Sequence, residues 1–256
     1  MPAQDHQKSF ILTVAESKRL IARAVKLHPA VETALKKGIV AVAKGSTNSY
    51  VVEELTGERI HRQHYCTGVT RPLRGGQAGE TADRLPDLVL RKGERVQGTP
   101  AVKMAAEMGP GDVFIKGANA LNYDKRQAGI LIGHPTGGTV GAVLGTLVSR
   151  RVTLLIPVGL EKSIPGDIHE LYREMAAAGP TGSGPMLWPV DGEILTEVEA
   201  IGLLSGARAA PIGAGGIGGA EGSVRLSVWG SAEQVNRAEA AIEAVLGEPP
   251  LLAAQP

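Results

Sequence analysis

The first 178 residues alternate between short apolar runs and longer stretches in which apolar residues recur every three or four positions. The apolar runs lie at residues 39–43, 87–90, 113–115, 130–132 and 151–158. Their length and lack of helical spacing predict buried strands. Helical spacing predicts helices at residues 13–37, with a break near His28-Pro29, and at 49–55, 100–108, 140–148 and 169–178. This alternation predicts an α/β fold with an open, mostly parallel, Rossmann-like sheet and helices on both faces.

A second pattern begins after residues 179–185, which are rich in glycine, proline and serine and are typical of a linker. The order of elements is then strand, helix, strand, strand and helix, at residues 186–190, 196–205, 207–212, 224–229 and 231–246. This order predicts a ferredoxin-like α+β domain. We therefore expect an α/β ligand-binding domain at residues 1–180, a ferredoxin-like domain at residues 186–248 and a disordered tail at residues 249–256.

Three loops that follow predicted strands combine glycine with hydroxyl, amide or lysine side chains, at residues 44–48, 116–122 and 133–139. Parallel sheets bind ligands at the carboxyl ends of their strands, so we expect the loops to converge on one site. The expected ligand-binding residues are Lys44, Gly45, Ser46, Thr47, Asn48, Lys116, Gly117, Ala118, Asn119, Gly137, Gly138 and Thr139. The alternative is that these glycines only allow helices to pack closely on strands.

The first of these loops, residues 44–48, has the features of an anion site. It offers a glycine, two hydroxyls, an amide and a lysine beside the unpaired N–H groups of a helix start. Free backbone donors and the helix dipole both favour negative charge, so we expect this loop to bind a phosphate. An ordinary helix start capped by Ser46 or Thr47 is the alternative.

Two carboxylates near the loops are candidates for acid–base catalysis. Asp124 is followed by Lys125, and Glu161 by Lys162. A carboxylate can act as the base while the amine stabilises negative charge, although surface ion pairs would have the same sequence. His61 and His64 have only Cys66 as a neighbouring ligand type, so we expect no metal site, and no motif indicates a cofactor.

Composition narrows the classes of partner. A formal net charge of +1 and an aromatic content of 3% argue against nucleic-acid binding. The most apolar region is interrupted by glycine, proline and arginine, which argues against a membrane span. Residues 1–9 are polar and carry no signal-peptide core, and Cys66 is the single cysteine, so we expect a cytoplasmic protein. A homo-oligomer stays possible, and the roles of the basic segment 59–85 and of the glycine-rich segment 213–222 stay open.

The sequence Lys44-Gly45-Ser46-Thr47-Asn48, with its following helix, resembles the Gly-Ser-Thr phosphate loop of one superfamily. This is the superfamily of ribose-5-phosphate isomerase, glucosamine-6-phosphate deaminase and the CoA-transferases. Residues 112–121 look like its second loop, and the resemblance covers about residues 14–178. It implies that residues 45–48 bind a phosphate or CoA moiety, while Asn119 stands where many members have an acid.

From these features we expect a protein that binds a small phosphorylated or CoA-linked metabolite at the carboxyl edge of its sheet. The resemblance implies an isomerase or a transferase. A non-catalytic metabolite sensor or binding protein is the alternative.

Overall fold

A six-stranded sheet forms the centre of the computed structural model, which describes residues 6–67, 70, 84–178 and 184–251. Its strands lie in the order β10(Glu193–Leu195), β8(Thr153–Pro157), β5(Val113–Ile115), β2(Ile39–Val42), β3(Leu88–Arg91) and β4(Glu94–Arg95). The first four are parallel, whereas β3 and β4 are antiparallel to their neighbours. The predicted α/β class and the mostly parallel sheet are therefore confirmed.

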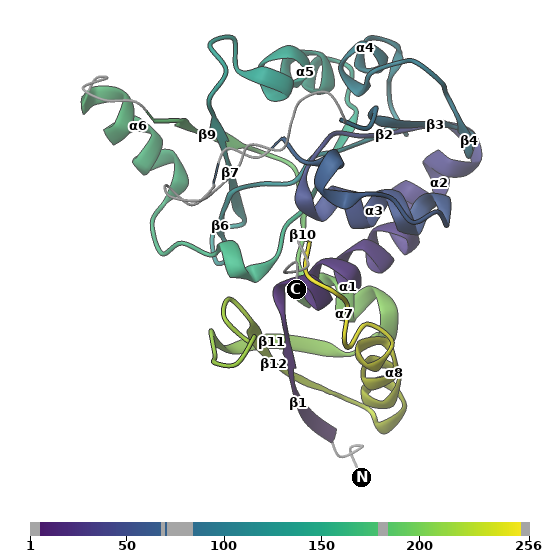
Figure 1. Ribbon diagram of the computed structural model, residues 1–256, viewed down its shortest axis with the longest axis vertical. Coiled ribbons are helices and arrows are strands. Elements are labelled where there is room, and N and C mark those ends of the chain that lie inside the picture. The colour runs from purple at the N-terminus through teal and green to yellow at the C-terminus, as the bar shows by residue number, and fades with distance from the viewer. Residues whose placement is uncertain (1–5, 68–69, 71–83, 179–183, 252–256) are drawn as a thin grey trace.

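Helices cover both faces of this sheet (Figure 1). In β2, Val40 and Val42 pack in one core with α1(Val14–Leu27), α2(Pro29–Lys37) and α3(Ser46–Thr56). Ile39 and Ala41 face the opposite core, which contains residues of α4(Ala101–Met104) and α5(Gly138–Ser149). All four β2 residues are buried because the strand has a helical layer on each side, as its uninterrupted apolar run predicts.

A second sheet, β6-β7-β9, is antiparallel throughout and differs from the prediction. It consists of β6(Ala120–Asn122), β7(Gln127–Ile132) and β9(Met186–Val190), and α6(Ile168–Ala178) packs against it. We expected residues 130–132 in the parallel sheet. The chain instead reverses in a turn where the Arg126 N–H donates to the Tyr123 carbonyl at 3.1 Å, with Arg126 at φ 54°. The hairpin pairs one edge of β7 with β6, and its other edge pairs with β9, so β7 lies in a separate antiparallel sheet.

The third sheet joins the two ends of the chain. Its strands are β1(His6–Leu12), β12(Val224–Gly230) and β11(Arg208–Ala214), all antiparallel. Helices α7(Glu197–Ser205) and α8(Ala232–Glu243) pack with it, and both begin with capping boxes. The strand expected here at residues 186–190 is β9, which pairs with β7 instead. β1 takes its place, hidden in the sequence because most of its residues are polar and exposed.

Strand pairing and side-chain packing cross the domain boundaries that we expected at residues 180 and 249. β10 pairs with β8, and β1 pairs with β12, so both halves of the chain contribute to shared sheets. Leu251, within the expected disordered tail, packs against the main core. The division into two folding units stays a prediction, and residues 68–69 and 71–83 of the basic segment lie outside the described residues.

Among the described residues, no helix has both the length and the apolar character needed to cross a membrane.

Candidate functional site at the carboxyl edge

The segments that follow the four parallel strands meet at one edge of the main sheet. Asn48, after β2, donates its Nδ2 hydrogens to the carbonyls of Ala43 at 2.7 Å and Ile115 at 3.2 Å. Lys162, after β8, donates to the carbonyl of Ala118 at 2.8 Å. These bonds tie the segments after β2, β5 and β8 to one another, as the rule for parallel sheets predicts for two of the three glycine loops.

The start of α3 keeps unused hydrogen-bonding groups. Its N-cap residue is Gly45, and no side chain caps the N–H groups of Ser46, Thr47 and Asn48. Thr47 and Asn48 are 2% and 0% exposed. Their side-chain atoms Thr47 Oγ1 and Asn48 Oδ1 are nevertheless buried without a hydrogen-bond partner. The helix start therefore offers backbone donors together with two unsatisfied polar atoms.

Lys44 and Gly45 have structural partners. The Lys44 Nζ lies 3.7 Å from Asp87 Oδ1, and the Gly45 N–H donates to the Tyr65 carbonyl at 2.9 Å. A Cβ added at Gly45 would meet its nearest atom at 3.9 Å, an ordinary contact. This position does not need glycine for space, and the donors left for a ligand are those of residues 46–48.

Glu197, which the sequence analysis did not single out, is fully buried at this edge. It accepts the Leu160 N–H at 2.9 Å. Burial raises its pKa, and the charge of Glu161 raises it further. In the sequence Glu197 is simply an acidic residue in the first turn of a helix, where such residues are common. Only its burial and its hydrogen bond from Leu160, which follows β8, place it at the candidate site.

Glu161 lies at the same edge, as expected, and both of its carboxylate oxygens are buried without a hydrogen-bond partner. Its carboxylate occupies the space next to Gly159, where an added Cβ would lie 1.8 Å from Glu161 Oε2. Gly159 has φ −77°, so the requirement for glycine comes from this close approach and not from the backbone conformation.

Two lysines at the edge have lowered pKa values. For Lys162, burial lowers the pKa, while the charges of Glu161 and Glu197 act in the opposite direction. For Lys116, burial lowers the pKa to about 8, with a further contribution from the positive charge of Lys162. Lys18 of α1 also acts electrostatically on Lys162. The edge thus collects lysines and glutamates in surroundings where each charge is incompletely hydrated.

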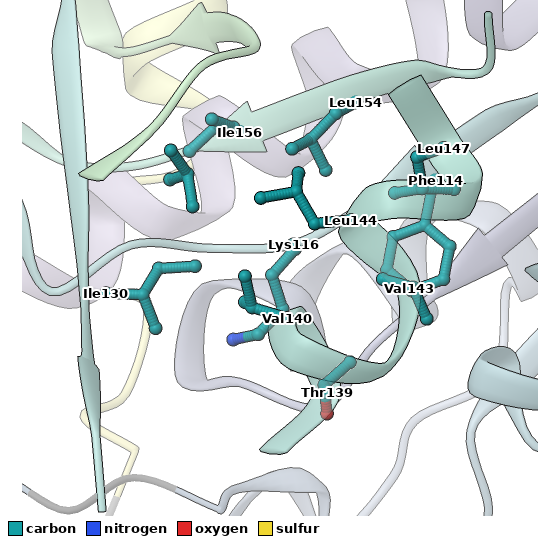
Figure 2. A pocket seen from close by; sticks show the side chains of 11 residues that line it. Phe114, Lys116, Ile130, Thr139, Val140, Val143, Leu144, Leu147, Leu154 and Ile156 are labelled. Atoms are coloured by element: carbon teal, nitrogen blue, oxygen red, sulfur yellow. The ribbon is translucent and has the colours of Figure 1, made fainter. Parts of the chain in front are cut away.

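The third glycine loop reaches this region by a different route. It follows β7 of the second sheet, and Gly137 and Gly138, with φ 81° and 57°, lead into α5. Thr139 in the first turn of α5 shares a cavity with Lys116 (Figure 2). The cavity is small, with a volume of about 10 Å³ open to a water-sized molecule. Its other lining residues are apolar: Phe114, Ile130, Val140, Val143, Leu144, Leu147, Leu154, Ile156 and Val190.

Asp124 and Asn119 lie where their side chains are exposed or hold the fold together, and not where they could act on a ligand. Asp124 is exposed in the turn between β6 and β7, and Lys125 beside it pairs with Asp167 at 2.8 Å. Asn119 Oδ1 accepts the Leu131 N–H at 3.0 Å, which joins the segment after β5 to β7. Of the two carboxylates singled out for catalysis, Glu161 therefore has the buried, unpaired setting that favours chemistry, and Asp124 does not.

Within the described part of the chain, no three histidine, cysteine, aspartate or glutamate residues are grouped so that they could hold a metal ion. No family model matches the sequence, and neither the curated proteins nor the solved structures contain a match to it.

Proposed function

We propose that this protein binds a small phosphorylated or CoA-linked metabolite at the carboxyl edge of its parallel sheet and transfers a proton on it. The observation that carries the proposal is the cluster of unsatisfied atoms. Thr47 Oγ1, Asn48 Oδ1 and both oxygens of Glu161 are buried there without partners. Each such atom costs about 1–3 kcal/mol of stability. A bound ligand that supplies the missing hydrogen bonds explains why these atoms, all in segments that follow parallel strands, have no partners within the chain.

The chemistry of these groups favours a ligand with both acceptor and donor atoms. The N–H groups at the start of α3 and the Thr47 hydroxyl can donate to phosphate oxygens. The Asn48 Oδ1 and an ionised Glu161 carboxylate can only accept hydrogen bonds. They therefore suit hydroxyl groups of the same molecule. A phosphorylated compound that carries hydroxyl groups matches both sets.

The two glutamates supply a means of proton transfer. Glu197 has a raised pKa because it is buried close to Glu161, and two neighbouring carboxylates do not readily ionise together. One can hold a proton while the other takes one from the substrate, the arrangement that general acid–base catalysis needs. For an isomerase, one carboxylate would remove a proton from the hydroxyl-bearing carbon beside a carbonyl group while the carbonyl oxygen takes up a proton. A proton would then return to the former carbonyl carbon as the neighbouring hydroxyl group loses its own and becomes the new carbonyl. For a transferase, a Glu161 oxygen would instead bond to the thioester carbonyl carbon, forming an acyl anhydride as the carbon–sulfur bond breaks and the CoA thiolate leaves.

This function fits the resemblance to the superfamily of ribose-5-phosphate isomerase, glucosamine-6-phosphate deaminase and the CoA-transferases. We propose in addition that the main sheet is Rossmann-like and that residues 45–48 form the phosphate-binding loop. The alternative, a sensor that binds the metabolite without turning it over, is favoured by Asn119. It stands where many superfamily members have an acid, and its side chain is engaged by the Leu131 N–H.

Thermal melting with and without ligand tests the binding site. Inorganic phosphate, ribose 5-phosphate and CoA should be compared on the parent and on Thr47→Val, which removes a hydroxyl without a partner. Without ligand the variant should be at least as stable as the parent. A ligand at about 100 times its dissociation constant should stabilise the parent by roughly 2.7 kcal/mol, and Thr47→Val by less.

Thr33→Val is the matched control, because the Thr33 hydroxyl is exposed on α2 and donates to the Pro29 carbonyl far from the edge. It should respond to ligand like the parent. The proposal is wrong if none of the three compounds stabilises the parent, or if Thr47→Val and the parent respond equally.

A further inference from the structure

The three sheets of the described chain end in six edge strands, and β1 differs from the other five. β4, β6 and β10 are only two or three residues long. β9 contains Pro189, and β11 contains Pro211 with a shift of register beside it. Short edges, prolines and bulges are the usual means by which a sheet is kept from pairing with another chain. Five of these six edges therefore carry a protective feature.

β1 is a long and regular edge strand. It has seven residues, contains no proline or glycine, and pairs with β12 in an unbroken register from His6 to Leu12. Among the described residues, no backbone hydrogen bond joins its opposite side to another element. Figure 1 shows β1 at the lower end of the molecule, below the main sheet and next to the start of the chain. The outward N–H and C=O groups of β1 are therefore available to another strand.

A lysine on an edge strand usually repels an incoming strand, but the charge of Lys8 is balanced. The Lys8 Nζ forms a salt bridge with the carboxylate of Glu239 in α8, so this side chain lies on the face of the sheet that the helices cover. Side chains alternate along a strand, and the other face of β1 carries Gln7, Ser9 and Ile11. These three are uncharged and exposed. The edge thus has no unpaired lysine to keep a second strand away.

We propose that β1 pairs in antiparallel fashion with β1 of a second copy of this chain, forming a homodimer with a continuous six-stranded sheet. Antiparallel pairing of a strand with itself has two-fold symmetry, so one contact satisfies both open edges and closes the assembly. Ser9 is the middle residue of β1, and only a register centred on it pairs all seven residues. In this register Ser9 lies opposite the partner's Ser9.

The side chains of β1 suit this register. Lys8 lies opposite the partner's Phe10, and Gln7 lies opposite the partner's Ile11, so no like charges face each other. The two facing serines can hydrogen-bond across the strands. A register centred on Lys8 would instead place two lysines opposite each other and would leave part of each strand unpaired. The helix-covered faces of the two copies then lie on the same side of the joined sheet.

The dimer does not depend on the proposed function, and it should be weak. A single pair of seven-residue strands makes a small interface, below about 1,200 Å² in total, and interfaces of that size are typical of transient association. Sedimentation equilibrium of the full-length protein, from roughly 1 µM to 1 mM, covers the range in which such a dimer forms. The parent should show a reversible equilibrium between monomer and dimer.

Substitutions at Ser9 test both the edge and the register. Ser9 is exposed, so the monomer tolerates a charged side chain there. Ser9→Lys places two like charges directly opposite each other in the dimer and should raise its Kd roughly fivefold, and Ser9→Glu should do the same. An equal mixture of the two variants should dimerise more tightly than either variant alone, because a lysine then faces a glutamate.

Ile212→Lys is the matched control, because Ile212 is 57% exposed on β11, at the opposite edge of the same sheet. It should dimerise like the parent. A parent that stays monomeric over the whole concentration range would overturn the inference. Equal dimerisation of the parent and Ser9→Lys, or a mixture no tighter than its two components, would overturn it as well, since the contact would then lie elsewhere.

Discussion

Glu197 lies fully buried within reach of the charge of Glu161, and no salt bridge to any described residue neutralises either carboxylate. Burying two neighbouring acids in this way is unfavourable for folding unless one of them keeps its proton. The pair therefore links the protonation state of the candidate site to the stability of the whole fold, and it allows several direct tests.

The stability of the protein should depend on pH through Glu197. Burial first, and Glu161 second, raise its folded-state pKa to about 7, against about 4.3 in the unfolded chain. Below the unfolded pKa its contribution is fully present. As pH rises toward 7 the unfolded chain loses the proton that the folded protein keeps, so stability falls, by at most roughly 4 kcal/mol.

Urea denaturation of the parent and of Glu197→Gln, at intervals from about pH 5 to about pH 8, measures this effect. The variant should lack the fall and should gain on the parent as pH rises. Asp124→Asn, on the exposed turn, is the control and should follow the parent. A constant difference between the parent and Glu197→Gln at every pH would contradict the raised pKa.

Catalysis, once a substrate is identified, should depend on Glu161 and not on Asp124. Glu161→Gln keeps the shape of the side chain and removes its charge, so the turnover number should fall about 10²–10⁴-fold. Asp124→Asn should keep the parental rate because Asp124 lies in the exposed turn between β6 and β7. Steady-state kinetics of both variants decides the matter, and a parental rate for Glu161→Gln would support the sensor.

Gly159→Ala should impair the site while preserving the fold. The added Cβ would lie 1.8 Å from Glu161 Oε2, so the carboxylate must move, whereas the backbone at φ −77° accepts alanine. We expect weaker stabilisation by ligand and little change in the melting temperature without ligand. Gly145→Ala, in α5 with no neighbour within 4 Å, should instead gain up to about 1 kcal/mol. Parental ligand stabilisation in Gly159→Ala would show that the position of Glu161 does not matter for binding.

The ion-pair network around Arg19 should be important for stability. Arg19 is 3% exposed and donates hydrogen bonds to Glu53, Glu54 and Glu248. Replacing it with methionine leaves Glu53 and Glu248 with only Arg59 and Arg62 as cationic partners. The loss of the buried charged hydrogen bonds should cost about 1.5–3 kcal/mol in chemical denaturation. Arg23→Met is the control, because Arg23 is 34% exposed and 4.0 Å from Glu54, and it should cost less than about 0.5 kcal/mol. Equal losses of unfolding free energy in the two variants would mean that the buried network stabilises the protein no more than an exposed ion pair does.

Proteolytic cleavage between Ala178 and Gly184 should not separate the two parts of the chain. β9 pairs with β7, β10 with β8, and β1 with β12, so strands from each side of the cut remain hydrogen-bonded to the other side. Size-exclusion chromatography of the nicked protein should show one species, which resolves into two fragments only under denaturing conditions. Fragments that separate without denaturant would favour independent folding units.

Local patterns in the sequence were sufficient to predict most helices and strands of the described chain. The break at His28-Pro29 separates α1 from α2, and Thr196 forms with Glu199 the capping box that their three-residue spacing favours. The buried parallel strands β2, β5 and β8 were also found from their apolar runs. These features depend on residues a few positions apart, whose contacts are set by the geometry of a single helix or strand.

Only the tertiary structure decided which strands pair and which polar groups become buried. An apolar run has the same local pattern whether its partner strand is parallel or antiparallel. The pairing of β9 with β7 therefore cannot be predicted from the sequence pattern. Glu197 and Lys116 are likewise an ordinary glutamate and an ordinary lysine along the chain. Packing of distant segments around them excludes water, and this loss of hydration changes their pKa values and makes them candidates for chemistry.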